Sequence, residues 1–472
     1  SNNLNIGYGG AGYLEIRSGG AVASYAGHVG LNGDGSVSVS GPDSAWTATD
    51  EIIVGAPGSA HDGTMSIQDG GAVTSGRASI GYIGRGDVLV EGSGSHWHSS
   101  GYLNVGSSGG EGTLVVTNGA IVSSVTGVVG LDSGYGYVVI TGANSAWDLT
   151  SGLQVGVNTG VGNLMIMDDA FLNVANGTGT ITIGSNYGTG ALILGQSQNG
   201  VRAGVINAGT ITGGGSSGQL QLATAATSTL PYFLTKDGTA GGSPVTLTGP
   251  LAVLNFDGYN VLSGTNTYTG GTYLNGGTLV AASNGALGTG TIQFQGGRLS
   301  VASGVTLSNP LSLTSGGVLG GNGTIGSAVT VGTGVELAPG NSVGLLTFSS
   351  GTTWGPGGTY DIEIQSALGS RGVGYDSITV TGGLTFTATL GSPFTFNLIS
   401  LDVGGSPGAV SDFNSASSYS WLIAQTDGLT GFNIANLQIA TANFTNNLGA
   451  GAFPVSTTGS NVYLNLRTVP EP

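Results

Sequence analysis

Alternating positions mark short runs in the first half of the chain. In residues 13–17, 64–68 and 163–167, Leu, Ile or Met recurs at every second position, and the residues between would face the other way. A period of two predicts β-strands with one side turned toward a core. The runs span four to six residues and are bounded by glycines. The sequence therefore predicts many short strands joined by tight corners.

The strand pattern itself repeats about every 50 residues. The corner glycines Gly7, Gly55, Gly106 and Gly156 open successive repeats and are 48, 51 and 50 residues apart. Each repeat divides at a further glycine into steps of 23 to 28 residues. One coil of this size cannot bury its apolar face, whereas stacked coils can. We therefore expect an all-β fold, a parallel β-helix (β-solenoid) of about 20 to 28 residues per coil.

The repeat changes character twice along the chain. The 50-residue pattern covers residues 1–196, and a different repeat at 263–280 predicts that the solenoid continues through residues 197–353. From about Trp354 the runs lengthen and aromatic side chains become more frequent. We expect residues 354–472 to form a β-rich C-terminal cap or sandwich.

Charge is sparse and acidic. Only 7% of the 472 residues are charged, and the formal net charge is -16. Such a surface repels nucleic acid and anionic membranes. No apolar run approaches the roughly 18 residues of a membrane-spanning helix. Cysteine is absent, so disulfides and thiolate metal sites are excluded. We expect no nucleic acid partner and no membrane insertion of the mature chain.

Patterns for catalysis and calcium binding are weak. Asp168 and Asp169 form an adjacent acidic pair, but neighbouring coils supply only Asp69 at the equivalent position, which favours a corner over a catalytic site. Residues 32–35 match part of a calcium-binding repeat once, without the reiteration that such solenoids carry. An ordinary turn is favoured over structural calcium. We expect no enzymatic activity and no cofactor.

Two further motifs have simpler interpretations. His96 and His98 would lie on one face of a strand, but no third metal ligand can be named. Residues 85–87 spell the adhesion tripeptide Arg-Gly-Asp, yet the glycines around them also suit a corner. Neither motif predicts a site.

Tryptophan and threonine recur at regular positions. Trp46, Trp97 and Trp147 are 51 and 50 residues apart. They would either form a surface ladder that stacks on sugar rings or plug the corners of alternate coils, and we favour plugs. Residues 178–182 carry threonine at every second position, as in ice-binding rows. We expect equivalent coils to lack threonine there and therefore expect no flat ice-binding face.

Several segments resemble known secreted proteins. Residues 4–196 resemble bacterial secreted repeats with a Leu/Ile-x-Val-Gly start, a Gly-Gly-Ala-Val middle (residues 70–73) and a Ser-x-Trp end (residues 95–97). Residues 263–280 resemble the autotransporter-associated β-strand repeat of passenger domains that fold as parallel β-helices, and residues 337–342 fit the way such passengers close.

The last four residues resemble a sorting signal. Val469, Pro470, Glu471 and Pro472 are similar to the PEP-CTERM motif, although the membrane helix and basic tail that follow it in that family are missing. Together the resemblances imply export to the bacterial cell surface or extracellular matrix.

The ends of the chain suggest assembly. The first repeat starts almost at once, so the first coil is expected to be uncapped. We expect the C-terminal region of one subunit to cover the first coil of the next, head to tail, in a contact that does not close and so makes a filament. The residues assigned to this contact are Leu4, Ile6, Val462, Tyr463, Leu464 and Leu466.

Three functions follow, in order of preference. The first is an extracellular structural protein that assembles with itself into a surface or matrix filament. The second is an adhesin or exopolysaccharide-binding β-helix. The third is a polysaccharide-cleaving β-helix enzyme, which would need converging carboxylates in one groove.

Overall fold

The computed structural model describes residues 2–55, 61–196, 200–215, 217–314, 316–449 and 451–467. The chain divides into two compact units, Ser1–Gly271 and Thr272–Pro472, which are described separately. Apart from single 3₁₀ turns such as η1 (Ala175–Gly177) and η3 (Ile434–Asn436), the regular elements described are β-strands. In the same residues no helix has the length and apolar character needed to cross a membrane.

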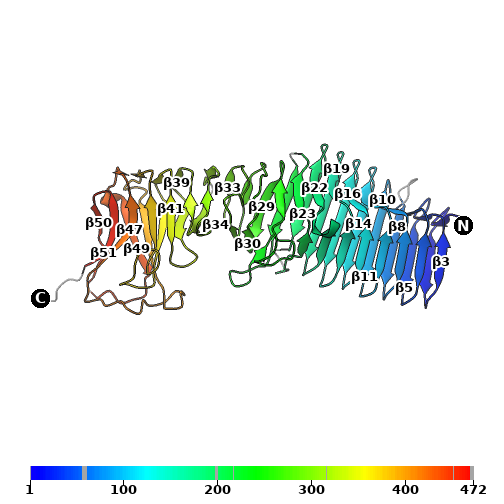
Figure 1. Ribbon diagram of the computed structural model, residues 1–472, viewed down its shortest axis with the longest axis horizontal. Coiled ribbons are helices and arrows are strands. Elements are labelled where there is room, and N and C mark those ends of the chain that lie inside the picture. Colours follow the sequence, from blue (N-terminus) through cyan, green and yellow to red (C-terminus); the bar gives the residue numbers. More distant parts are fainter. Residues whose placement is uncertain are drawn as a thin grey trace. The chain divides into compact units, whose positions relative to one another are not determined.

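Unit 1 winds its chain through three parallel sheets (Figure 1), here called sheets A, B and C. Each of the first eight coils contributes one strand to each sheet, and successive coils pair in parallel. Sheet A contains β1 (Leu4–Ile6), β4 (Gly27–Val29), β7 (Glu51–Val54), β10 (Arg77–Tyr82), β13 (Tyr102–Ser107), β16 (Thr126–Leu131), β19 (Leu153–Val157), β22 (Thr180–Ser185), β25 (Thr210–Gly213) and β28 (Thr246–Thr248). The predicted parallel β-helix is confirmed.

The other two sheets of unit 1 have the same order along the stack. Sheet B contains β2 (Gly12–Arg17), β5 (Gly35–Ser40), β8 (Asp62–Gln68), β11 (Arg85–Glu91), β14 (Glu111–Thr117), β17 (Tyr135–Thr141), β20 (Val161–Met167), β23 (Thr189–Leu194), β26 (Gly218–Ala223) and β29 (Ala252–Asp257). Sheet C contains β3 (Ala21–Ser24), β6 (Ala45–Ala48), β9 (Ala72–Ser75), β12 (His96–Ser99), β15 (Ile121–Ser124), β18 (Ala146–Leu149), β21 (Phe171–Val174) and β24 (Val205–Asn207). A further short pair is β27 (Tyr232–Phe233) with β30 (Tyr259–Leu262).

Identical apolar positions of successive coils stack into the core of unit 1. In sheet A, Ile80, Val105, Val129 and Val155 lie in register on neighbouring strands, and each side chain is fully buried. Because alternate residues of a strand point to opposite faces, the residues between them face solvent. The outward faces of the three sheets are therefore where a ligand can be met.

The corners between sheets A and B require glycine. The predicted corner residues Gly7, Gly55, Gly106 and Gly156 all have positive φ, from 70° to 82°. At Gly106 a Cβ atom would come 2.1 Å from the carbonyl oxygen of Tyr135 in the next coil. A side chain here would be strained by the backbone conformation and blocked by the neighbouring coil, so the corners let the coils stack at strand spacing.

Unit 2 is also built from parallel ladders. One contains β31 (Thr272–Leu274), β33 (Ile292–Phe294) and β36 (Leu311–Ser312). A second contains β32 (Thr278–Ala281), β34 (Arg298–Val301), β37 (Gly317–Gly321), β40 (Val335–Pro339), β43 (Thr359–Ile364), β46 (Phe394–Ser400) and β49 (Leu437–Asn443). The others contain β35 (Thr306–Leu307), β38 (Thr324–Ile325), β41 (Leu345–Phe348), β44 (Ser377–Val380), β47 (Tyr419–Thr426), β51 (Asn461–Leu466) and β50 (Val455–Thr458), and then β39 (Val329–Val331), β42 (Thr352–Trp354), β45 (Leu384–Phe386) and β48 (Leu429–Thr430).

The aromatic side chains noted from Trp354 onward fill the interior of unit 2. The ring of Trp354 stacks on Phe394 with centroids 5.1 Å apart and meets Phe396 edge-on at 5.3 Å. The parallel ladder is closed by β51, which runs antiparallel between β47 and β50. The parallel ladder β43–β46–β49 continues up to residue 443, and the expected cap or sandwich over residues 354–472 stays a prediction. The expected boundaries after residues 196 and 353 stay predictions.

Candidate binding groove

The tryptophans of the repeat are buried. Trp46, Trp97 and Trp147 lie on the inward face of sheet C with at most 1% of each residue exposed. Each indole N–H donates to a serine hydroxyl in the preceding coil; for Trp97 the acceptor is Ser75 Oγ at 3.2 Å. The hydrogen bond satisfies the only polar atom of the indole, so the ring can fill the core. These rings are not available to stack on sugars.

The histidines and the Arg-Gly-Asp tripeptide lie on strands. His96 and His98 share the outward face of β12; His98 Nδ1 lies 2.8 Å from Ser123 Oγ and His96 Nδ1 lies 3.2 Å from the Gly94 carbonyl oxygen. Residues 85–87 begin strand β11 and are not a corner, and Arg85 pairs with Asp87 at 3.0 Å. The two charged residues of the tripeptide therefore form an ion pair with each other.

The carboxylates of the acidic corners contact other residues of the same chain. Asp168 and Asp169 both have positive φ in the turn after β20, and Asp169 lies 3.7 Å from the Arg202 guanidinium. Asp34, in the expected calcium motif, accepts the Asp62 backbone N–H at 3.1 Å and lies 3.3 Å from His61. Within the described ranges, no three side chains of His, Asp or Glu gather as metal ligands.

The expectation that equivalent coils lack threonine was wrong. Thr180 and Thr182 on β22 lie in register with Thr210 and Thr212 on β25, and these with Thr246 and Thr248 on β28. Insertions between the strands hid this register, because the three pairs are 30 and 36 residues apart in sequence. Thr178 lies outside this array, in the corner before β22, where its hydroxyl donates to the Ala175 carbonyl at 2.7 Å.

A polar column crosses the outward face of sheet C. Asp148, Asn173 and Asn207 lie in register on β18, β21 and β24. The Asn173 side-chain amide donates to the Asp148 carboxylate at 2.6 Å. Carboxylates and carboxamides spaced one strand apart present alternating acceptors and donors, which suits a ligand that offers several hydroxyl groups.

An insertion turns this column into a groove. The turn η1 follows β21, and Ala175 and Asn176 there have φ of 47° and 50°. The same conformation recurs at other turns of the chain, for example at Asn158 and Thr159. Gly177 follows, and a Cβ atom there would come 2.3 Å from Asn207 Oδ1. The turn thus lies directly against the polar column.

The resulting hollow has a volume of about 600 Å³. It is lined by Asp148, Leu149, Thr150, Asn173, Ala175, Asn176, Thr178 and Asn207. Phe171, 37% exposed, precedes Asn173 by two residues and so lies on the same face of β21. An aromatic ring beside a row of amides and a carboxylate provides both stacking and hydrogen bonding for a sugar. Sequence inspection missed this groove because its three polar residues are separated by 25 and 34 positions.

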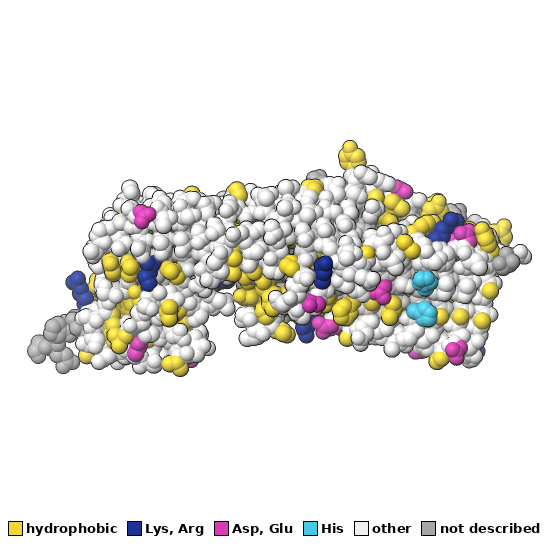
Figure 2. Space-filling view, in the orientation of Figure 1, with side chains coloured by type: hydrophobic (Ala, Val, Ile, Leu, Met, Phe, Trp, Pro, Cys, Tyr) yellow, Lys and Arg dark blue, Asp and Glu magenta, His cyan; other side chains and the backbone are white. Residues whose placement is uncertain are grey.

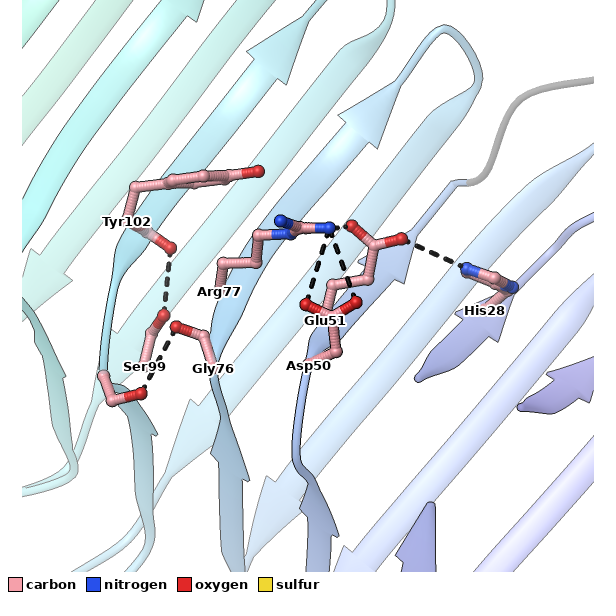
Figure 3. Close-up of polar contacts among 8 residues, drawn as sticks. His28, Asp50, Glu51, Gly76, Arg77, Ser99 and Tyr102 are labelled. Carbon is pink, nitrogen blue, oxygen red and sulfur yellow. Dashed lines mark hydrogen bonds and ion pairs between the residues drawn. The ribbon is translucent and has the colours of Figure 1, made fainter. Parts of the chain in front are cut away.

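A second polar cluster lies at the start of sheet A (Figure 3). Arg77 Nε is 3.1 Å from Glu51 Oε2, its Nη2 is 3.5 Å from Asp50, and His28 Nε2 is 3.6 Å from Glu51 Oε1. The hydrogen bond to Glu51 raises the pKa of the Arg77 guanidinium, and burial raises the pKa of the Tyr102 phenol. The charges in this cluster compensate one another, so it is better suited to joining coils than to binding an ion.

Unit 2 contains a carboxyl pair that the sequence analysis did not find. Glu336 on β40 and Asp361 on β43 lie on neighbouring strands, and Asn397 donates to Asp361 at 2.9 Å. Burial and the neighbouring Asp361 raise the pKa of Glu336 to about 7.

The residues assigned to subunit contact are in different environments. Leu4 and Ile6 lie on β1, which pairs with β4 at the edge of sheet A. Val462, Leu464 and Leu466 are fully buried in unit 2, and Tyr463 lies between them on β51. Both edges of β51 are already paired within the chain. The sorting motif Val469, Pro470, Glu471 and Pro472 lies outside the described residues.

Comparison with known proteins supports a likeness to autotransporters. No protein-family model matches the chain. The chain is similar to the adhesin BmaC autotransporter of Brucella suis biovar 1 (strain 1330), with 36% identity over 92 residues. The match covers 18% of this chain and 3% of the adhesin, so the chain spans a small part of that protein's length. The autotransporter resemblance is confirmed at this level, and the PEP-CTERM resemblance stays a prediction.

Proposed function

We propose that this protein is a surface-exposed, glycan-binding β-helix of the adhesin type. The observation that carries the proposal is the groove on sheet C, where Asp148, Asn173 and Asn207 lie in register beside Phe171. The similarity to part of an autotransporter adhesin supports location at the bacterial surface or in the surrounding matrix. An exopolysaccharide is the partner that this chemistry suits.

The proposed role is binding without catalysis. Asp148 is the only carboxylate among the residues that line the groove. Glycoside hydrolysis generally needs two. The low charge of the surface also suits a neutral ligand, since Figure 2 shows uncharged side chains over most of the face it presents. Nucleic acid and membrane are not proposed as partners, because the net charge of -16 repels both.

Assembly into a filament is a separate proposal. Because both edges of β51 are paired, a head-to-tail contact would have to use side chains of the C-terminal cap, or a backbone edge other than that of β51. Light scattering of the purified chain over a wide concentration range tests it. A mass that grows with concentration supports the filament, and a constant monomer mass contradicts it.

Glycan binding is tested with a matched pair of double variants. An array of neutral and acidic polysaccharides first identifies bound glycans, and titration then measures affinity. We expect the double variant Asp148→Ala with Asn173→Ala to bind at least tenfold more weakly, because two or more hydrogen bonds are lost. The control is Thr47→Ala with Thr74→Ala, an in-register pair in the same outward column that lies three or more coils from Asp148.

The outcomes separate clearly. Binding that weakens only in the groove variant supports the proposal, as does an unchanged length of the polysaccharide after incubation with the protein. An array without signal, or equal losses in both double variants, contradicts glycan binding at this groove. Shortening of the polysaccharide would instead support the enzymatic alternative.

A further inference from the structure

The groove on sheet C has a neighbour on sheet A. A second hollow of about 380 Å³ lies on the outward face of sheet A. It is lined by Thr126, Gly127, Val128, Ser151, Gly152, Leu153, Gln154, Thr180 and Thr182. None of these side chains is charged, and Gln154 lies in register with Thr182. Its lining is thus a hydroxyl and amide surface like that of the first hollow.

The two hollows meet at one corner of the β-helix. Thr150 and Thr178 line the first, whereas Ser151, Gly152 and Thr180 line the second. The chain passes from sheet C to sheet A at these positions in two successive coils. Gly152 has no side chain, so the ridge between the hollows is low there. A Cβ atom at that position would already lie 3.3 Å from the Thr180 carbonyl oxygen.

The surface continues beyond the second hollow. Thr182, Thr212 and Thr248 form one column on sheet A, and the Thr267 backbone N–H bonds to the Leu247 carbonyl, which places Thr267 in register with Thr248. Within the described residues, the Thr212 hydroxyl contacts the Gly213 carbonyl at 3.4 Å, and those of Thr182 and Thr248 have no protein partner. These hydroxyls can therefore donate to and accept from a ligand.

The extent and charge of the surface formed by the two hollows indicate which class of ligand it can bind. Asp148 and Gln154 are six residues apart, so the path across the corner is at most about 20 Å. A ligand that reaches both hollows must bridge two faces of the β-helix, which favours an extended chain of several sugars over a single one. The lining has many hydroxyls and amides but only one charge, that of Asp148, which disfavours an anionic polymer.

We propose that an extended, neutral polysaccharide chain lies across this corner and occupies both hollows at once. The sheet C groove with its polar column holds one stretch of sugars, with Phe171 on the same face outside the hollow. The Gln154 and Thr182 side of sheet A holds the next stretch. This inference rests on the proposed glycan-binding function, because it assumes that sheet C binds sugar. It adds the length and neutrality of the chain and a second contact surface.

Affinity as a function of chain length tests the inference. The probes are cello-oligosaccharides from disaccharide to octasaccharide, which are neutral and extended, with alginate oligosaccharides as anionic chains of matched length. Affinity for the cello-oligosaccharides should rise by at least tenfold from the shortest to the longest and then level off, because the second hollow fills only when the chain crosses the corner. Alginate of equal length should bind more weakly.

Variants on sheet A locate the second contact. The double variant Gln154→Ala with Thr182→Ala should lower affinity for the octasaccharide about tenfold and leave that for the disaccharide unchanged. The control Asn104→Ala changes an amide in the same outward column outside the hollow, and should change neither.

Four results would overturn the inference while leaving glycan binding at sheet C intact. The first is an affinity that does not depend on chain length, and the second is an equal effect of the sheet A variant on short and long chains. The third is tighter binding of alginate than of cello-oligosaccharides. The fourth is that cello-oligosaccharides do not bind at all, although the sheet C variants abolish binding of another array glycan. If the sheet C variants have no effect on any glycan, the proposed function itself fails.

Discussion

Single residues in this protein are constrained by the neighbouring coil. Trp97 fits the core because Ser75 one coil earlier accepts its indole N–H, and Gly106 fits its corner because the Tyr135 carbonyl of the next coil leaves no space for a Cβ atom. Both constraints recur in several coils. A substitution therefore changes mainly the stability of the coil on which the residue packs.

Two glycines separate backbone strain from steric exclusion. Gly106 and Gly109 have φ of 70° and 82°, but an added Cβ atom meets the Tyr135 carbonyl at 2.1 Å in the first case and nothing within 4 Å in the second. Gly109→Ala should cost about 1 kcal/mol of local stability, the usual penalty for a left-handed alanine. Gly106→Ala should cost several-fold more.

Hydrogen exchange of the backbone amides in β13, β14 and β17 measures this difference. Faster exchange in Gly106→Ala than in Gly109→Ala is expected. Equal rates in the two variants would show that the neighbouring carbonyl moves aside, and that the corner does not demand glycine for spacing.

Register matters most at the level of strands. The sheet C column and the sheet A threonines come together because β-strands pair in parallel, so residues one coil apart become neighbours. The same pairing places carboxyl groups of β40 and β43 together in unit 2, and Asp376 nearby accepts backbone N–H groups from Gly344 at 2.7 Å and from Glu363 at 2.9 Å.

These buried acids predict a dependence of stability on pH. Burial raises the pKa of Glu336 to about 7 from its ordinary 4.5, and burial also raises the pKa of Glu363 and Asp376. Above the unfolded pKa the unfolded chain has lost these protons while the folded chain keeps them. The free energy of unfolding should therefore fall as pH rises from about 4.5 to about 7.

Thermal unfolding at pH 5.5 and pH 8 measures the effect. Unit 2 should melt at a higher temperature at pH 5.5, and Glu336→Gln should reduce the difference because that side chain stays neutral. Asn397→Ala, which removes a neighbouring amide without a titrating group, serves as the control. A transition temperature that rises with pH would contradict the assignment.

The whole molecule is governed by its low charge density. A net charge of -16 spread over 472 residues opposes non-specific association of chains at neutral pH. With only eight Lys and Arg residues, most of this repulsion is lost once the carboxyl groups take up protons.

Solubility should accordingly pass through a minimum near pH 4, the ordinary range of carboxyl titration. Light scattering between pH 3.5 and pH 8 at low salt measures the association. Added salt at pH 7 should increase scattering by screening the same repulsion. Equal scattering across the pH range would show that charge does not limit association.

The sequence by itself determined the architecture. Alternating apolar positions, the recurrence of Gly7, Gly55, Gly106 and Gly156, and the regular tryptophans were enough to predict a parallel β-helix, because these signals lie within one strand or recur at a constant spacing. The same spacing led to the interpretation of the tryptophans as corner plugs; the structure buries them, but on strands of sheet C and not at corners.

The tertiary structure decided which outward residues meet. The groove brings together Asp148, Asn173 and Asn207, and the threonine array skips from Thr182 to Thr212 and Thr248, across insertions of unequal length. An outward side chain gains little from burial, so it leaves no periodic signal in the sequence. Its neighbours are set only when the apolar rows of successive coils lock the register of the sheets.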